Sequence, residues 1–220
     1  IKAVCCVHHE TSCGITSDIQ AVRESIDSTG HPALLLVDSI SGLASVDYEH
    51  DLWGVDVTVS GSQKGLMMPP GLGFNALSER AIEVAKKGGS KRSYWDWQDM
   101  LNANATGYFP YTPATTLFYG LREAIAMLEE EGLDNVFSRH QRLADSCRAA
   151  VRAWELETVC LNPREHSNAL TGIMMPDGHD ADYLRDVILE HFDMSLGTGL
   201  GKIKGKAFRI GHLGDINELT

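Results

Sequence analysis

Basic side chains and long apolar runs are both scarce in this 220-residue sequence. It contains 19 lysines and arginines against 30 aspartates and glutamates, which gives a formal net charge of −11. That balance argues against a surface for nucleic acid or for an anionic membrane. No apolar run approaches the roughly 20 residues that a membrane-spanning helix needs. We therefore expect neither nucleic acid nor a membrane as a partner, and a small anionic substrate would need a local basic site.

The cysteines and histidines do not fall at the spacings of a metal site. The five cysteines are Cys5, Cys6, Cys13, Cys147 and Cys160. An odd number in a long chain, without tight spacing, is typical of reduced thiols, and we expect a cytoplasmic protein. No metal is predicted. The sequence begins at Ile1, without a methionine and inside a strand-like run, so we expect an internal segment of a longer chain.

The first half of the sequence alternates short apolar runs with helical patterns. Apolar runs that end in polar loops predict strands of a parallel sheet, here over residues 2–7, 33–37 and 55–59. A helix is predicted over 19–26, with Ser17 and Asp18 as capping residues and Gly30 beyond its end. Residues 72–77 follow a Pro-Pro-Gly turn and are predicted to return as a strand. A helical pattern without one clean apolar stripe follows Ser78.

The second half begins with an aromatic-rich stretch over residues 86–112, which predicts a loop packed on the core or on a partner chain. Two helices follow, one from Pro113 at the first helical position to Gly132, and one over 134–154. Residues 170–174 and 207–210 are predicted strands that flank a helix over 180–192. We therefore expect an α/β fold: a mainly parallel sheet in residues 1–112, then connecting helices and a small α+β domain in 113–220.

Two predicted strands deliver a carboxylate and an amine to one edge of the sheet. Asp38 ends the run Leu34-Leu35-Leu36-Val37, and Lys64 follows Val59-Ser60-Gly61-Ser62-Gln63. Ligands of open α/β sheets bind beyond the carboxyl ends of the strands. A lysine there could form a Schiff base, and an aspartate could pair with a pyridinium nitrogen. Together these two roles would make up a protein's share of pyridoxal 5′-phosphate (PLP) chemistry.

Four long strings carry a family resemblance that covers the sequence from about its first residue to its last. They are LLLVDSISGLAS, DVTVSGSQKGLMMPPGLGF, GYFPYTPATTLFYGLREAIAMLEEEGLDNVFSRH and KAFRIGHLGD. The sequence resembles the alanine/serine–glyoxylate aminotransferases, class V PLP enzymes of fold-type I. The resemblance implies the carboxyl-terminal part of a PLP-binding domain, a small domain after it, and a homodimer with shared active sites. It also implies that a glycine-rich phosphate loop and a ring-stacking aromatic precede this segment in the whole enzyme.

The resemblance assigns roles around the cofactor. Lys64 is expected to bind PLP covalently and to shuttle the α-proton, and Asp38 to keep the ring nitrogen protonated. The position of Gln63 contacts the cofactor beside the lysine, that of Thr11 hydrogen-bonds near the ring, and Ile40 packs on the ring face. Thr11 and Ile40 stand where some relatives have Ser and Val.

Other roles lie farther along the sequence. Arg209, in Phe208-Arg209-Ile210-Gly211, matches the position that clamps the substrate α-carboxylate. Thr112, with Tyr108 or Tyr111, is expected to reach the cofactor phosphate of the neighbouring subunit. The glycine-rich run 197–201 resembles a phosphate cradle without a following helix pattern, and predicts a mobile loop leading to Arg209.

The expected reaction is ping-pong transamination with glyoxylate as acceptor and glycine as product. Serine is the favoured donor, and alanine and aspartate stay open. A cysteine desulfurase is a less favoured alternative, because that family usually has a histidine before the lysine, where Gln63 stands, and needs an exposed cysteine, whereas Cys160 has an apolar setting. A non-enzymatic alternative is a segment that serves only in dimerisation or binding.

Overall fold

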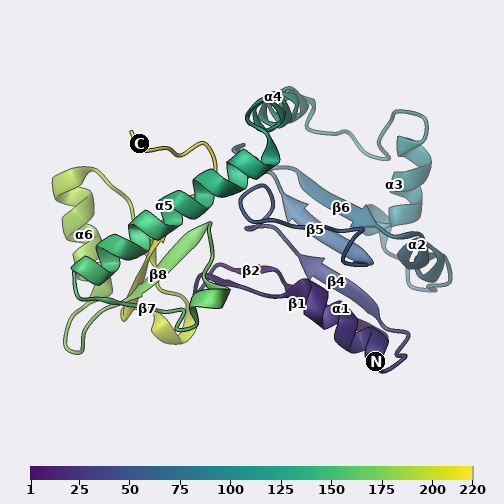
Figure 1. Cartoon of the computed structure of the whole chain (residues 1–220). Helices are drawn as coiled ribbons and strands as arrows, with labels where there is room; N and C mark the ends of the chain where they lie inside the picture. The colour runs from purple at the N-terminus through teal and green to yellow at the C-terminus, as the bar shows by residue number, and fades with distance from the viewer. Residues whose placement is uncertain (220) are drawn as a thin grey trace.

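Two four-stranded sheets joined by long helices make up the chain in a computed structural model that describes residues 1–219 (Figure 1). The first sheet has the strand order β1-β4-β5-β6. Strands β1 (Ala3–Val7), β4 (Leu34–Asp38) and β5 (Val57–Gly61) run parallel, and β6 (Gly73–Leu77) is antiparallel to β5. The α/β fold with a mainly parallel sheet is confirmed. Polar residues after β1, β4 and β5 therefore meet at one edge of the sheet.

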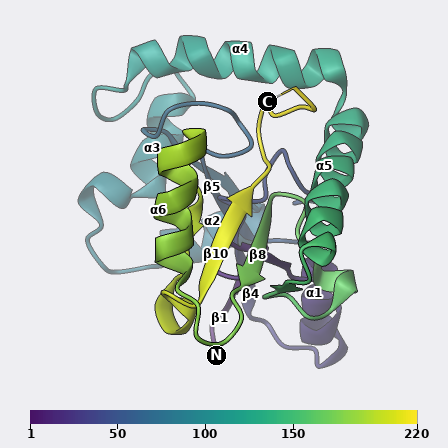
Figure 2. The ribbon, with the colours of Figure 1, turned by 90° about the vertical axis from the view of Figure 1, so that its left-hand side faces the viewer.

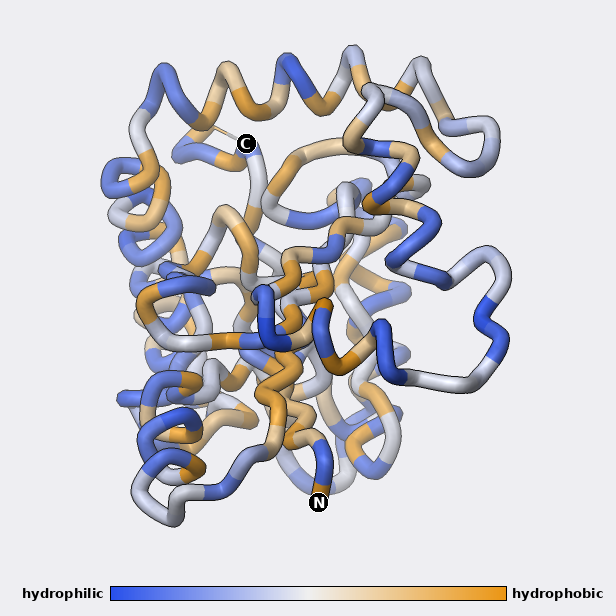
Figure 3. The backbone as a smooth tube through the Cα atoms, turned by 90° about the vertical axis from the view of Figure 1, so that its right-hand side faces the viewer, coloured by the Kyte–Doolittle hydropathy of each residue, from blue (hydrophilic) through white to orange (hydrophobic). Residues whose placement is uncertain are grey.

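The core of the first sheet lies between its central strands and helix α1 (Ile19–Ser28). Leu35 and Val37 of β4 are buried against Ile19 and Ile26 of the helix. The side chain of Asp18 accepts a hydrogen bond from the Ala21 amide, which confirms Asp18 as the capping residue. In Figure 3 the central strands are mostly apolar, and polar residues recur along the outer helices. Apolar residues spaced along one helical face produce this packing.

Strand β1 is more exposed than its apolar sequence indicates. It pairs with β4 and stands at the edge of the sheet, where Cys5 and Val7 are exposed. The prediction of a parallel strand is confirmed, and the prediction that it is buried is wrong within this chain. An apolar run does not reveal which strand of a sheet lies at its edge.

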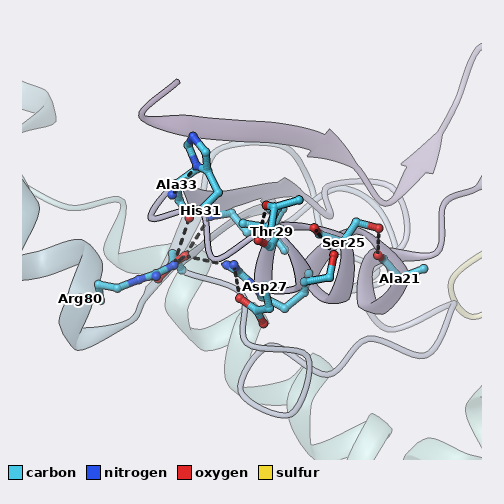
Figure 4. Close-up of polar contacts among 12 residues, drawn as sticks. Ala21, Ser25, Asp27, Thr29, His31, Ala33 and Arg80 are labelled. Atoms are coloured by element: carbon cyan, nitrogen blue, oxygen red, sulfur yellow. Dashed lines mark hydrogen bonds and ion pairs between the residues drawn. The ribbon is translucent and has the colours of Figure 1, made fainter.

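A buried carboxylate holds the amino end of the first sheet together. Asp56 precedes β5 and accepts hydrogen bonds from the Leu35 amide at 2.8 Å, the Ser78 hydroxyl at 2.9 Å and Arg80 Nε at 2.9 Å. Arg80 Nη2 also pairs with Asp56, and it donates to the Ala33 carbonyl oxygen at 3.3 Å (Figure 4). Burial by itself raises the pKa of Asp56, but these hydrogen bonds outweigh it and hold the pKa below its usual value.

The aromatic-rich stretch is partly helical, which the sequence did not indicate. Helix α2 (Glu79–Lys86), capped by Ser78, is followed by the 3-10 turn η1 (Ser93–Trp95) and helix α3 (Trp97–Asn104). The side chain of Asp96 accepts a hydrogen bond from the Gln98 amide, so α3 has a local start signal. The prediction of a loop is wrong for α3, and most of the aromatics are exposed rather than packed on the chain's own core: Tyr94, Trp95, Tyr108, Phe109 and Tyr111.

Helices α4 (Thr115–Glu131) and α5 (Leu133–Ala153) connect the two sheets. Helix α4 begins two residues after Pro113, with Ala114 as its cap, so Pro113 is not its first residue. Gly132 separates the helices at a φ of 81°, which a residue without a Cβ adopts readily. Leu128 and Val136 lie buried together on either side of it.

The second sheet is antiparallel and has the order β7-β8-β10-β9. Its strands are β7 (Glu157–Thr158), β8 (Leu170–Met174), β9 (Gly197–Thr198) and β10 (Ala207–Gly211). Helix α6 (Ala181–Phe192) and helix α5 pack on it, as Figure 2 shows. The 3-10 turns η2 (Pro163–Glu165) and η3 (Gly201–Ile203) and the small hairpin of β2 (His9–Glu10) and β3 (Ile15–Thr16) complete the elements.

The division at residues 112 and 113 stays a prediction. The run 197–201 does not form the loop that was predicted, because β9 pairs with β10 at Thr198 and Phe208 and at Gly197 and Arg209. Within residues 1–219, no helix combines the length and the apolar character that crossing a membrane requires.

Candidate active site

The carboxyl edge of the first sheet gathers the predicted residues of three strands. In the register of the sheet, Asp38 at the end of β4 lies opposite Val7 of β1 and Val59 of β5. The carboxylate of Asp38 is half-buried, and its Oδ1 accepts a hydrogen bond from the Ile40 amide at 2.9 Å. Within residues 1–219 its side chain makes no other hydrogen bond. Asp38 is therefore held by the turn after its strand and keeps acceptor capacity for a ligand.

Lys64 stands three residues beyond the end of β5 and is half-buried. It lines a hollow of about 500 Å³ whose other walls are Gln63, Met67, Met68 and residues 213–216. Among the residues that the structure describes, the lysine makes no ion pair with a carboxylate. Gln63 is exposed beside it. The amine therefore borders the hollow without a fixed carboxylate partner in the described part of the chain.

A close approach of two backbones fixes the segment that carries Lys64. A Cβ atom added to Gly65 would lie 2.1 Å from the carbonyl oxygen of Leu43, far inside normal contact distance. On either side of this approach, Ala44 and Met67 have φ values of 61° and 58°, in the left-handed region that non-glycine residues rarely adopt. Such backbone strain persists only where the surrounding structure imposes it. The loop after β4 and the loop after β5 are therefore locked together beside Lys64.

Ile40 lies on the same edge, half-buried above β5. Its Cγ2 would be 3.7 Å from a Cβ atom added to Gly61, the last residue of β5. The apolar side chain thus lies beside the last residue of β5, and its role toward a cofactor stays a prediction.

Arg209 comes from the second sheet and connects it to the hairpin of β2 and β3 that follows β1. Its Nε donates to the Thr198 carbonyl oxygen at 2.7 Å, and its Nη1 donates to the Thr11 carbonyl oxygen at 2.9 Å. Within residues 1–219 its Nη2 has no hydrogen-bond partner and no carboxylate pairs with the guanidinium. Burial lowers the pKa of Arg209 because it disfavours the charged guanidinium, and repulsion by the positive charge of Arg185 adds a smaller effect. This is a half-buried cation without a counter-ion.

Thr11 belongs to a small hydrogen-bonded group at the end of β1. Its hydroxyl lies 2.8 Å from the Ser41 hydroxyl, which also lies 2.9 Å from His9 Nδ1 and donates to the His9 carbonyl oxygen at 3.0 Å. His9 and Ser41 are buried. Neither residue stands out in the sequence, because a histidine without metal-ligand spacing carries no signal and Ser41 is one of several serines after β4. Their pairing is visible only in the structure.

Three histidines are buried near this edge and are kept neutral. Burial lowers the pKa values of His8, His9 and His212 to about 4. For His9 the neighbouring imidazole of His8 adds to the effect. His212 is bonded on both nitrogens, to the Thr171 hydroxyl and to the Asn168 carbonyl oxygen, each at 2.9 Å. These three rings are therefore neutral at pH 7.

Tyr108 and Thr112 lie outside this group. Both are exposed, Tyr108 by 73% of its surface, in the segment between α3 and α4. Within residues 1–219, neither residue makes a side-chain hydrogen bond or ion pair with the predicted site residues at the sheet edge, which are Lys64, Asp38, Gln63, Ile40, Thr11 and Arg209. The expected role of Tyr108 and Thr112 is toward a neighbouring subunit, which this single chain does not test.

Comparison with known proteins gives one consistent result. The aminotransferase class-V family matches residues 1–199. A serine–glyoxylate aminotransferase of Methylorubrum extorquens is 48% identical over 100% of this chain and 56% of its own length. An L-aspartate–glyoxylate aminotransferase of Paracoccus denitrificans is 44% identical over 99% of this chain and 55% of its own length. The crystal structure of pyridoxamine–pyruvate aminotransferase from Mesorhizobium loti superposes with a TM-score of 0.92 at 31% identity, over 97% of this chain and 55% of that one. The chain spans about half the length of these relatives.

Proposed function

The chain belongs to the class-V aminotransferases, and from this we propose that it is part of a PLP-dependent enzyme that transfers the amino group of serine to glyoxylate. The observation that carries the proposal is Arg209. Its guanidinium is held between the carbonyl oxygens of Thr198 and Thr11, and no carboxylate within residues 1–219 neutralises it. A half-buried cation of this kind is costly without an anion. The α-carboxylate of an amino acid supplies one.

The residues at the sheet edge fit PLP by their chemistry. Asp38 has acceptor capacity beyond its one bond to the Ile40 amide, and Lys64 has an amine without a counter-ion within the described part of the chain. We propose that Lys64 holds the cofactor covalently and that Asp38 faces its ring nitrogen. Gln63 and Thr11 would contact it by hydrogen bonds and Ile40 by its apolar side chain. When bound, PLP accepts the electron pair that is released at the α-carbon of the substrate.

The chain's own residues then perform three tasks. Arg209 binds the α-carboxylate and so orients the amino acid, because a guanidinium can bind a carboxylate through two parallel hydrogen bonds. Lys64 Nζ takes the α-proton and returns it at the end of the transfer, acting as base and then as acid. The carboxylate of Asp38 holds a proton on the ring nitrogen, since a negative charge nearby favours the protonated form of a base.

The donor proposal rests on relatives and on sequence strings. A relative named serine–glyoxylate aminotransferase is 48% identical, and one named L-aspartate–glyoxylate aminotransferase is 44% identical. The segments PYTPATTLFYGLR and FRIGHLG also favour serine. Alanine and aspartate are the alternative donors, with glyoxylate as acceptor in each case.

We further propose a homodimer in which Thr112 and Tyr108 serve the partner subunit. The support is that both side chains are exposed in their own chain. A non-enzymatic segment that serves only in dimerisation or binding is the alternative.

A cysteine desulfurase is less well supported. Such an enzyme needs a cysteine thiolate that reaches the substrate. Cys160 is 4% exposed, and burial raises its pKa, which opposes thiolate formation.

The direct test is to reduce the full-length enzyme with borohydride in the presence of PLP and to locate the pyridoxyl group by mass spectrometry. The expected result is one adduct, on Lys64, that is absent from the Lys64→Ala variant. A panel of serine, alanine and aspartate with glyoxylate then identifies the donor. An adduct on another lysine, or none, would overturn the aminotransferase proposal.

A further inference from the structure

Three hydrogen-bonding contacts converge on one buried hydroxyl beside the proposed cofactor site. Ser41 Oγ lies 2.9 Å from His9 Nδ1, 2.8 Å from Thr11 Oγ1 and 3.0 Å from the His9 carbonyl oxygen. Ser41 is 7% exposed and His9 is 2% exposed, so water does not compete for these groups. A hydroxyl has one proton to donate and two lone pairs to accept with. The three contacts therefore use its full capacity.

The positions of the protons follow from counting donors and acceptors. The His9 carbonyl oxygen can only accept, so the Ser41 proton goes to it. The other two contacts are hydrogen bonds only if Ser41 Oγ accepts both of them. His9 then carries its proton on Nδ1, and Thr11 donates its hydroxyl proton to Ser41. No other arrangement satisfies all three contacts at once.

A second observation agrees with this tautomer of His9. Its Nε2 is buried and has no hydrogen-bond partner within residues 1–219. With the proton on Nδ1, the unpaired atom is an acceptor. With the proton on Nε2, it would be a buried N–H donor without a partner, which is rarer in proteins. The doubly protonated ring is not formed near pH 7, because burial lowers the pKa of His9 to about 4.

We propose that His9 and Ser41 are positioning residues that commit the hydroxyl proton of Thr11, so that Thr11 can only accept a hydrogen bond from the ligand. The group it recognises is then a hydroxyl or N–H of the bound cofactor or substrate, and an unprotonated oxygen in that place is disfavoured. This inference rests on the proposed function only for the identity of the ligand. The Thr11 backbone is held independently, by Arg209 Nη1 on its carbonyl oxygen.

The first test does not need the cofactor. In the full-length protein without PLP, labelled with ¹⁵N in histidine, the side-chain nitrogen shifts report which nitrogen of each ring carries the proton. His9 is assigned by the loss of its signals in His9→Asn. We expect the Nδ1–H tautomer for His9. The Nε2–H tautomer would overturn the proposal whether or not the protein is an aminotransferase.

The second test is a double-mutant cycle read by PLP binding to the full-length enzyme. If Ser41 acts through the Thr11 hydroxyl, Ser41→Ala changes the dissociation constant about three- to tenfold in the presence of Thr11 and less than about twofold in a Thr11→Val background. A purely structural role would give equal changes in both backgrounds and would overturn the proposal.

His9→Asn and His9→Phe form a matched pair. The asparagine amide can place an N–H near the position of Nδ1, so His9→Asn should bind PLP within about twofold of the wild type, and His9→Phe should bind like Ser41→Ala. Equal losses in both variants would contradict a role for the Nδ1 proton. If the enzyme binds no PLP at all, the proposed function fails, and the nitrogen shifts still decide this inference.

Discussion

Each end of the first sheet holds an aspartate, buried at the amino end and half-buried at the carboxyl end, and the surroundings of the two differ. At the amino end, Asp56 receives hydrogen bonds from a backbone amide, a serine hydroxyl and an arginine. At the carboxyl end, Asp38 receives one, from the Ile40 amide, and nearby polar atoms are left without partners within residues 1–219: His8 Nδ1, His9 Nε2, Ser45 Oγ and Ser60 Oγ.

This difference in hydrogen bonding assigns the amino end to stability and the carboxyl end to the proposed function. A buried polar group with all its hydrogen bonds made contributes to one defined structure, whereas an unpaired one costs free energy unless a ligand completes it. Strain follows the same division, since the close approach at Gly65 and the left-handed residues Ala44 and Met67 lie at the carboxyl end. The carboxylate at the amino end is thus fully engaged, although Arg23 Nε beside it has no partner within residues 1–219, whereas several polar groups at the carboxyl end stay open, where we propose that a ligand binds.

The largest effect is expected at Lys64. In the full-length enzyme, Lys64→Ala should lower transamination by about a thousandfold or more, because it removes both the proposed covalent attachment and the proposed acid–base group. Its unfolding midpoint without PLP should stay close to that of the wild type, since the lysine pairs with no carboxylate within the described residues. The control is Lys86→Ala, which removes an exposed lysine paired with Glu83 and should leave activity unchanged. Activity that survives Lys64→Ala would show that the carboxyl end of the sheet does not carry the chemistry.

The comparison itself is tested by the pair Asp56→Asn and Asp38→Asn. Asp56→Asn should destabilise the protein by about 2–3 kcal/mol, which allows for the partial exposure of Arg80. Asp38→Asn should cost less than about 1 kcal/mol, because one backbone hydrogen bond is at stake, while transamination should fall steeply. Urea unfolding and steady-state rates measure the two quantities. Equal losses of stability would show that the two aspartates contribute alike to the free energy of unfolding, which contradicts the comparison.

The strained approach beside Lys64 is tested by Gly65→Ala. A Cβ atom there would lie 2.1 Å from the Leu43 carbonyl oxygen, so the two loops must move apart. We expect a loss of about 1–3 kcal/mol in unfolding free energy and weaker PLP binding. Gly73→Ala is the matched control, since nothing lies within 4 Å of a Cβ atom at that position. If both variants unfold alike, the close approach is not a constraint.

The smallest expected effect is on how the stability of the fold depends on pH, which should differ between His9 at the carboxyl end and Asp56 at the amino end. His9 has a pKa of about 4 in the fold, lowered from 6.5. Between these values the unfolded chain binds a proton that the folded chain does not, so stability falls as the pH falls. The lowered pKa of Asp56 acts at more acidic pH, where its stabilisation is lost as the carboxylate is protonated.

Urea unfolding at several pH values separates these contributions. His9→Asn should reduce the loss of stability between about pH 6.5 and pH 4 relative to the wild type, because an asparagine does not titrate. Asp56→Asn should keep that loss and reduce the one below about pH 4. The reverse behaviour of the two variants would contradict a histidine that titrates above the aspartate.

Local sequence signals were sufficient for most elements and for their order. Apolar runs located β4 and β5, Asp18 and Ser78 marked helix starts, and the two strands led directly to Asp38 and Lys64. These features depend on neighbours within a few residues, so they can be read from spacing. Helix α3 was missed because its aromatic, weakly periodic sequence lacks an apolar face, although Asp96 caps it. Pro113 was misplaced because a helix start can shift by one or two residues without changing the apolar pattern.

The sequence by itself determined which side chains stand at the ends of the strands, because strand and turn signals are local. Only the tertiary structure decided which of them meet. Arg209 reaches the carbonyl oxygen of Thr11 from 198 residues away, and His9 reaches Ser41 from 32 residues away. Such contacts depend on how two sheets and their loops pack, and no spacing along the chain encodes them. The same packing leaves Asp38 open and closes Asp56, a difference that two aspartates next to apolar strands do not reveal.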